Sequence, residues 1–266
     1  MNIGIKMIKL MIVVVAATFC LISQGYASAL LIEDILPWDY NSNSQTLTDI
    51  GIPFVKINSN DIATTDFTPY QFVVFASVQN QPFYDNIKTN FSKIDNYVQG
   101  GGILIAHSAL WGWPGNGLWY APDLLPGGVD RVQEYSNSVH VTDPSSPIIS
   151  GPYGTLSAAD FQAWDYSTHG YFTDLVAGTH IIIDLNDLNK PCYIEYDWGN
   201  GLVRATMMTV EWGQNDANNT RYIFRENEFY AAANPVQPIP EPATMLLLGS
   251  GLVGLAGFAR RRFLKK

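Results

Sequence analysis

The stretch that decides the fold is Tyr97–Gly115, with the sequence YVQGGGILIAHSALWGWPG. It begins as the end of a helix, continues through three glycines into the apolar run Ile103–Ala106, and stops at His107-Ser108. A short apolar run bounded by turn residues is typical of a buried strand. In open α/β sheets, ligands and nucleophiles gather where strands end. The stretch therefore predicts a central strand that carries a candidate site at His107 and Ser108.

Strands and helices alternate on the N-terminal side of this stretch. Apolar runs predict strands over Ala29–Ile35, residues 52–58 and Pro69–Ser77, followed by the one over residues 102–108. Residues 41–51 predict a short helix, and apolar positions spaced by three and four predict a longer helix over residues 83–98. This alternation predicts an α/β fold, a flavodoxin-like three-layer sandwich around a mostly parallel sheet. The first, third and fourth strands should be central.

The C-terminal half of the domain is less regular. Leu110–Gly128 is a long loop rich in glycine, proline and tryptophan, and Asp160–Phe172 also has the composition of a loop. Further expected elements are a strand and turn within residues 137–151, a strand over His180–Asn186, a hairpin over residues 191–209 that turns at Gly199-Asn200-Gly201, and a closing helix over residues 218–233.

The N-terminus has the order of a signal peptide. Lys6 and Lys9 precede an apolar segment over residues 10–22, and Ala27-Ser28-Ala29 is a small-x-small cleavage site. We therefore expect a signal peptide over residues 1–29 and a mature chain that starts at Leu30. An uncleaved N-terminal hydrophobic helix is the alternative.

The C-terminus has a second targeting pattern. A proline-rich linker over residues 234–242 ends in Pro240-Glu241-Pro242, and an apolar helix with a basic tail follows over residues 243–266. Such a helix acts as a stop-transfer segment. The order resembles the PEP-CTERM sorting signal of Gram-negative bacteria. That resemblance implies export through the inner membrane, transient anchoring by this transmembrane helix, an exosortase as partner, and release to the cell surface or matrix. It also implies a link with exopolysaccharide.

Residues 30–233 form one domain with a strongly acidic composition. They carry 8 Lys and Arg against 23 Asp and Glu, a net charge of −15. This charge argues against binding to nucleic acid or to anionic membranes. Cys192 is the one cysteine of the domain, so an internal disulfide is excluded, and there is no Cys/His cluster with zinc spacing. We expect no metal and no cofactor.

Three segments together resemble one family. Residues 97–109, residues 139–151 and residues 191–208 are similar, in order and spacing, to motifs of the trehalose-utilisation (ThuA-like) branch of the class I glutamine amidotransferase-like domains. The resemblance spans about Ala29 to Gly213 and implies the fold more than the activity. Ser146 replaces a histidine that the second motif usually contains.

Comparison with the motifs of this family indicates that the chain lacks the glutaminase triad. Class I amidotransferases have a nucleophilic cysteine at the end of the fourth strand and a His-x-Glu after the late hairpin. This chain has His107 at the first place and Thr209-Val210-Glu211 at the second, so Glu211 remains while its histidine is replaced by Thr209. A thiolate nucleophile needs an adjacent imidazole that a carboxylate orients. We therefore expect no glutaminase activity.

The strand ends supply the other candidate site residues. His107 and Ser108 form either a base and nucleophile or a buried histidine with a structural role, and neighbouring side chains on a strand point to opposite faces. Glu33 and Asp34 end the first strand. With Glu211 and His107 they provide groups that bind a cation or act as acid and base, or the carboxylates are merely solvated.

Aromatic residues indicate a possible sugar site. Aromatic faces combined with hydrogen-bond acceptors suit sugar rings, although large aromatic side chains also fill protein cores. The candidate residues are Trp111, Trp113, Trp119, Trp164 and His169.

Two functions from different classes follow. The first is an exported, exosortase-processed surface or matrix protein with a catalytically degenerate amidotransferase-like domain, which binds or supports exopolysaccharide. The second is a carbohydrate-active or other hydrolase that uses His107 with the strand-end carboxylates. A matrix protein without a ligand site remains the structural alternative.

Overall fold

A computed structural model describes residues 28–109, 124–186, 189–212 and 219–235. The expected hydrophobic helices at the two ends and the PEP motif lie outside these residues. The contacts within the chain divide it into two compact units, Met1–Asn234 and Pro235–Lys266. Among the described residues, no helix has the length and apolar character needed to cross a membrane.

An eight-stranded sheet organises the domain, in the order β2-β1-β3-β4-β12-β11-β10-β6. The first five strands in this order run parallel, and the last three are antiparallel. Their bounds are β2 Phe54–Ile57, β1 Ala29–Ile32, β3 Phe72–Phe75, β4 Ile103–His107, β12 Gly201–Thr206, β11 Pro191–Trp198, β10 His180–Leu185 and β6 Val139–Val141. The prediction that the first, third and fourth strands are central is confirmed. β1 begins at Ala29, the residue that the sequence pattern places last in the signal peptide.

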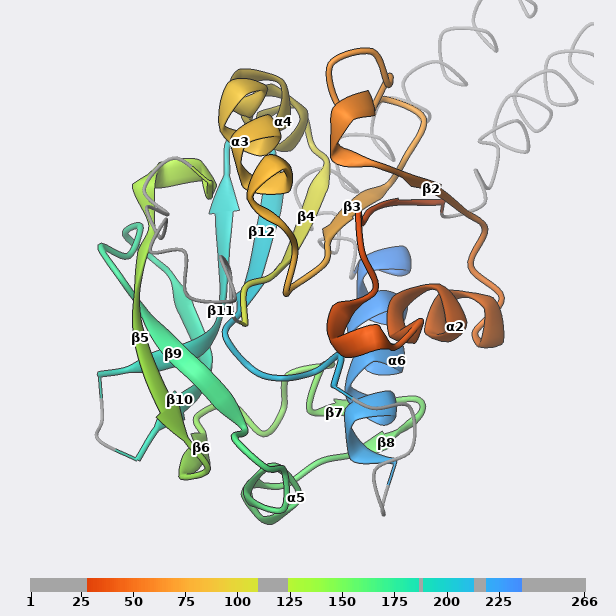
Figure 1. The fold of residues 1–266 in the computed structure, drawn as a ribbon. Coiled ribbons are helices and arrows are strands. Elements are labelled where there is room, and N and C mark those ends of the chain that lie inside the picture. Colours follow the sequence, from red (N-terminus) through yellow and green to blue (C-terminus); the bar gives the residue numbers. More distant parts are fainter. Residues whose placement is uncertain (1–27, 110–123, 187–188, 213–218, 236–266) are drawn as a thin grey trace, which may run out of the picture. The chain divides into compact units, whose positions relative to one another are not determined.

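Helices cover both faces of the parallel half of the sheet. Helices α3 (Gln81–Thr89) and α4 (Phe91–Gln99) pack on one face, in a core that includes Leu30 and Leu104. Side chains that alternate with these, such as Leu31 and Ile105, form a second core with α2 (Ser42–Asp49) and α6 (Thr220–Ala233). Figure 1 shows α2 beside the blue α6.

The expected helix over residues 83–98 is two helices, so this prediction is wrong in detail. Asn90 ends α3 with φ −105° and ψ 17°, and its backbone N–H donates to carbonyl groups of the last turn. The apolar spacing continues across Asn90, because α3 and α4 pack on the same core. The hydrophobic pattern therefore did not reveal the break.

A small second sheet was also missed. The expected loop over Asp160–Phe172 contains the end of helix α5 (Ala158–Gln162) and most of β9 (Thr168–Thr173). β9 pairs with β5 (Asp130–Ser136), whose mixed sequence DRVQEYS lacks the apolar run of a buried strand. The remaining short elements are β7 Ser150–Gly151, β8 Gly154–Thr155 and the 3-10 turns η1 Pro37–Asp39, η2 Ser59–Asp61 and η3 Pro126–Gly128.

The register of the sheet brings four strand ends to one edge. Ile32 of β1 lies opposite Phe75 of β3, Phe75 lies opposite Ala106 of β4, and His107 lies opposite Thr206 of β12. The residues that follow these ends must therefore converge. This edge is where an open α/β sheet holds its ligands.

Candidate functional site

His107 lies at the centre of the strand-end edge and is completely buried. Its Nδ1 is 2.9 Å from Oε1 of Glu211, and its Nε2 is 2.9 Å from Oε2 of Glu228. The ring of Phe229 stacks on the imidazole, with centroids 6.1 Å apart and planes 19° apart. Both ring nitrogens are thus held by carboxylates, and neither faces solvent.

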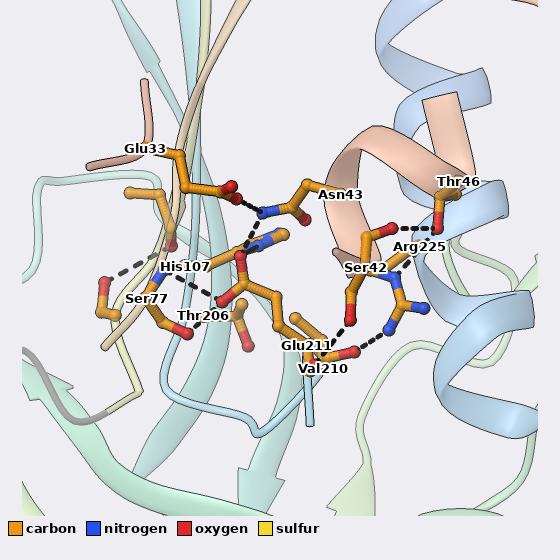
Figure 2. Close-up of polar contacts among 12 residues, drawn as sticks. Glu33, Ser42, Asn43, Thr46, Ser77, His107, Thr206, Val210, Glu211 and Arg225 are labelled. Atoms are coloured by element: carbon orange, nitrogen blue, oxygen red, sulfur yellow. Dashed lines mark hydrogen bonds and ion pairs between the residues drawn. The ribbon is translucent and has the colours of Figure 1, made fainter. Parts of the chain in front are cut away.

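Glu211 is the carboxylate that the sequence singled out, and several groups fix it. The backbone N–H of Ser77, which follows β3, donates to its Oε2 at 2.9 Å, and the Ser77 hydroxyl donates to the same oxygen. The side-chain amide of Asn43 on α2 donates to its Oε1. Ser42 donates to its backbone carbonyl at 2.7 Å. Figure 2 shows Glu211 between Ser77, Asn43 and His107.

Glu228 on α6 is a site residue that the sequence analysis missed. It is fully buried, and the hydroxyl of Tyr193 on β11 donates to its Oε1 at 2.7 Å. One feature of the sequence could have indicated that Glu228 is buried. Glu228 follows Phe224 and Arg225 at spacings of four and three, which puts all three on the buried face of α6. A carboxylate on the inner face of a helix requires a cationic or hydrogen-bonding partner in the core.

The two carboxylates make His107 a cation. Burial by itself would lower the pKa of His107, but the charges of Glu211 and Glu228 outweigh burial and raise it to about 10. Burial would likewise raise the pKa of Glu211, yet His107 and the donors around it hold that pKa below its ordinary value. The centre is therefore an imidazolium between carboxylates at neutral pH. An imidazolium has no lone pair, so His107 cannot act as a general base.

Glu33 reaches the same centre, whereas Asp34 does not. The Asn43 amide that binds Glu211 also lies 3.5 Å from Oε2 of Glu33, and Lys56 of β2 forms an ion pair with Oε1 of Glu33. Burial raises the pKa of Glu33, an effect that Lys56 partly offsets. Asp34 turns away and accepts hydrogen bonds from the backbone and hydroxyl of Ser59.

Ser108 does not pair with His107. Its hydroxyl donates to the backbone carbonyl of Ala106 at 3.3 Å, and its side chain is buried. This placement agrees with the expected opposite directions of neighbouring side chains on a strand. The described structure therefore contains no hydrogen-bonded nucleophile and base at these two positions.

The other residues relevant to a triad are also enclosed. Cys192 on β11 is buried, its thiol lies 3.5 Å from the carbonyl of Ile183, and burial raises its pKa. A thiol with a raised pKa is a poor nucleophile. Thr209 is buried and donates to the carbonyl of Tyr166 at 3.0 Å. Among the described residues, no group of three or more His, Cys, Asp or Glu side chains is arranged to hold a metal.

Two of the aromatic candidates, Trp164 and His169, lie in the described part of the chain. Trp164 is 2% exposed, its indole N–H donates to Thr220 at 2.7 Å, and it packs against Phe161 and Phe224. Its ring is a core ring with no face open to a sugar. His169 lies on β9, among other aromatic rings described below. Trp111, Trp113 and Trp119 lie outside the described residues.

Comparisons with known proteins identify the C-terminal signal. Residues 238–262 match the model of the PEP-CTERM protein-sorting motif. The chain therefore carries the sorting signal of exported proteins that an exosortase processes. An uncharacterized protein of Clostridium acetobutylicum is 29% identical over 219 residues, which are 77% of this chain and 21% of that protein. The chain thus spans about a fifth of the length of that relative.

Solved structures resemble the fold. A candidate GMP synthase component from Thermoplasma acidophilum has a TM-score of 0.50, with 12% identity over 79% of this chain and 95% of that one. A glutamine amidotransferase from Thermotoga maritima has a TM-score of 0.46, with 12% identity over 80% and 87% of the two chains. The α/β fold is therefore similar to that of the GMP synthase component. At this identity, the similarity concerns the fold and not the reaction.

Replacing His107 tests its structural role. His107→Ala leaves Glu211 and Glu228 buried without their cation, so we expect unfolding free energy to fall by about 3–5 kcal/mol at pH 7.5. Denaturant unfolding of the full chain, followed by tryptophan fluorescence, measures this loss. The matched control is His140→Ala, because the half-exposed His140 pairs with Asp184 at 3.3 Å and should contribute less than about 1 kcal/mol. Equal losses in both variants would contradict a structural role.

The charge of His107 also predicts a pH dependence. A histidine whose folded pKa is about 10 binds its proton more tightly than in the unfolded chain. Its stabilisation is complete below pH 6.5 and is lost as pH rises through 10. We expect the melting temperature of the wild type to fall between pH 7 and 10 more steeply than that of His107→Gln, which cannot titrate. Parallel pH profiles for the two proteins would show that His107 is not the charged group.

Proposed function

We propose that this chain is an exported protein of a Gram-negative bacterium, processed by an exosortase and placed at the cell surface or in the matrix. A signal peptide over residues 1–29 starts export. The tail over residues 243–266 anchors the chain transiently, and cleavage near Pro240-Glu241-Pro242 releases it. The amidotransferase-like domain over residues 30–233 does not catalyse. It has a binding or structural role linked to exopolysaccharide.

One observation carries the non-catalytic part of this proposal. The place where the family resemblance implies a nucleophile holds His107, and both of its ring nitrogens are bound by buried glutamates. A catalytic group must reach the atom on which it acts. A fully buried imidazolium with no free nitrogen cannot do so unless the helix that carries Glu228 moves. The arrangement supports a centre that holds the fold together.

The proposed role in polysaccharide binding is supported by the expected export of the chain and by the net charge of the domain. The PEP-CTERM motif supports export, and the resemblance behind it links such proteins to exopolysaccharide. The net charge of −15 over residues 30–233 suits a soluble exported domain and disfavours anionic partners. The Clostridium acetobutylicum relative is about five times longer than the matched region, so we transfer no activity from it.

A hydrolase is the second candidate, and one observation favours it. Glu33 and Glu211 lie on either side of the Asn43 amide, and their pKa values shift in opposite directions, upward for Glu33 and downward for Glu211. Two carboxylates with divergent pKa values are the pattern of an acid and base pair. However, both side chains are buried, so a substrate would have to displace Lys56 or Asn43 to reach them.

The sorting proposal predicts the effect of replacing the motif. With Pro240, Glu241 and Pro242 all changed to alanine, we expect the full-length chain to accumulate in the inner membrane with its tail uncleaved. Cell fractionation and intact-mass measurement report this outcome. Pro235→Ala, which lies in the linker before the matched residues 238–262, should be processed normally. Release of the triple variant at the wild-type rate would refute the proposal.

The two proposed functions predict different results in a polysaccharide hydrolysis assay. We expect the wild-type chain to release no more reducing ends from dextran, laminarin or galactomannan than Glu33→Gln does, because Glu33 has no access to a substrate. A reducing-sugar assay at several pH values measures the release. Activity that is present in the wild type and lost in Glu33→Gln, with folding intact, would favour the hydrolase.

A further inference from the structure

Five aromatic rings gather away from the His107 centre, and we name them the His169 cluster: Trp38, Tyr135, Tyr166, His169 and Trp212. The imidazole of His169 is the hub. Its centroid is 4.7 Å from that of Tyr135, 6.1 Å from that of Trp38 and 6.4 Å from that of Tyr166, all in edge-on contacts. Trp212 stacks on Trp38 with centroids 6.4 Å apart. The rings come from η1, β5, β9 with the turn before it, and the segment after β12.

The outer rings of the cluster face solvent. Tyr166 is 56% exposed and Tyr135 is 44% exposed, while Trp38 and Trp212 are half-buried. Large aromatic side chains of a soluble domain are usually buried against a core. Exposed tyrosine rings that converge with half-buried tryptophan rings from separate segments are typical of a surface for recognition.

His169 gives an independent sign that this surface takes a ligand. The residue is 6% exposed, and its Nδ1 is buried without a hydrogen-bond partner. Burial lowers its pKa to about 4, so the ring is neutral at physiological pH. A buried nitrogen without a partner is unfavourable by about 1–3 kcal/mol. Nδ1 is enclosed by its neighbours, so a ligand reaches it only when a ring of the cluster turns aside. A hydroxyl group can donate or accept, so it would then satisfy Nδ1 in either tautomer.

The inner rings of the cluster are held in place from behind. The guanidinium of Arg221 lies 5.3 Å from the ring centroid of Trp212 and 4.7 Å from that of the buried Trp164. Arg221 is itself fixed by a 3.0 Å hydrogen bond to the carbonyl of Thr209. Trp212 directly follows Glu211, so the His107 centre also anchors the segment that carries it. Such support orients the rings before a ligand arrives, which lowers the entropy lost on binding.

The chemistry of this surface selects its occupant. A sugar ring presents an apolar face to an aromatic side chain and hydroxyl groups at its rim. The cluster offers tyrosine and tryptophan faces together with one buried nitrogen that lacks a partner. The domain carries a net charge of −15, which repels anionic polymers such as uronate-rich polysaccharides or nucleic acids.

We propose that the His169 cluster is a binding site for an uncharged polysaccharide, whose sugar rings stack on Tyr135 and Tyr166. A hydroxyl group of the polysaccharide bonds to the buried Nδ1 of His169 after a neighbouring ring of the cluster turns aside. This inference rests on the proposed function and assigns its ligand class and site. Of the two expected sugar-site residues that the structure describes, His169 belongs to the cluster and Trp164 is a core ring behind it.

Affinity electrophoresis of the full chain tests the site. Native gels in a mild detergent contain dextran, laminarin or galactomannan as neutral probes, or alginate as the anionic comparison. We expect at least one neutral polysaccharide to retard the wild type and alginate not to do so. Tyr135→Thr and Tyr166→Asn should each weaken the association by about tenfold, the effect of roughly 1.4 kcal/mol. Threonine suits a strand, and asparagine tolerates the left-handed backbone of Tyr166, where φ is 52°.

Tyr230→Ala is the matched control for these variants. Tyr230 is 39% exposed on α6 and contacts Tyr153, outside the cluster, so its loss should leave retardation unchanged. Retardation that persists unweakened in Tyr135→Thr and Tyr166→Asn overturns this site but leaves a polysaccharide role elsewhere. Absence of retardation on every neutral gel, or retardation on alginate alone, overturns both the site and the polysaccharide role.

His169→Phe separates a ligand role from a packing role. Phenylalanine keeps an aromatic ring among the others and removes the nitrogen that lacks a partner. We expect a melting temperature equal to or above that of the wild type, together with at least about tenfold weaker polysaccharide binding. A variant that binds as tightly as the wild type overturns the assigned role of Nδ1. A destabilised variant would show that the nitrogen serves the fold, and this outcome also overturns the role.

Discussion

The imidazolium of His107, held between Glu211 and Glu228, is the interaction on which the rest of the domain depends. It joins the end of β4 to the segment after β12 and to α6. Both of these lie more than 100 residues from His107 in the chain. Removing a charge from water is unfavourable unless partners compensate for the loss. Here Ser77, Asn43 and Tyr193 supply hydrogen bonds to the carboxylates, so each oxygen of the two glutamates has a donor. Through these contacts Asn43 ties α2, and Glu228 ties α6, to the strand-end edge of the sheet.

The His107 centre lies where the family resemblance implies a catalytic triad. The resemblance implies a cysteine, a histidine and a glutamate at positions 107, 209 and 211. In the implied triad, the carboxylate of Glu211 would orient a histidine at position 209. In this chain His107 binds the same carboxylate directly. Glu228 then binds the second nitrogen from α6. In the described structure, an ion pair with two glutamates thus stands where the resemblance implies a thiolate.

The central sheet could be predicted because its strands are buried on both faces. β1, β3 and β4 are fully apolar up to their ends, and the register then brings the predicted residues Glu33, His107 and Glu211 together. Glu228 could not be paired from sequence, since the contact joins residues 121 apart and depends on the rotation of α6. β5 was missed because none of its residues is fully buried and its sequence is mixed. Trp164 was taken for a ligand residue because composition does not distinguish a core ring from a surface ring.

The two buried histidines of the domain show why its ligand should be sought away from the strand ends. His107 has a partner for each nitrogen and raised basicity, so any ligand that approached it would have to break an ion pair already formed. His169 is neutral and has a buried nitrogen without a partner, next to rings that face solvent. Binding free energy is gained where the protein alone has left a group unsatisfied, and not where the fold has satisfied it already. The same residue type thus has a partner for each nitrogen at one place and an unsatisfied nitrogen at the other, and the difference lies in which neighbours the fold supplies.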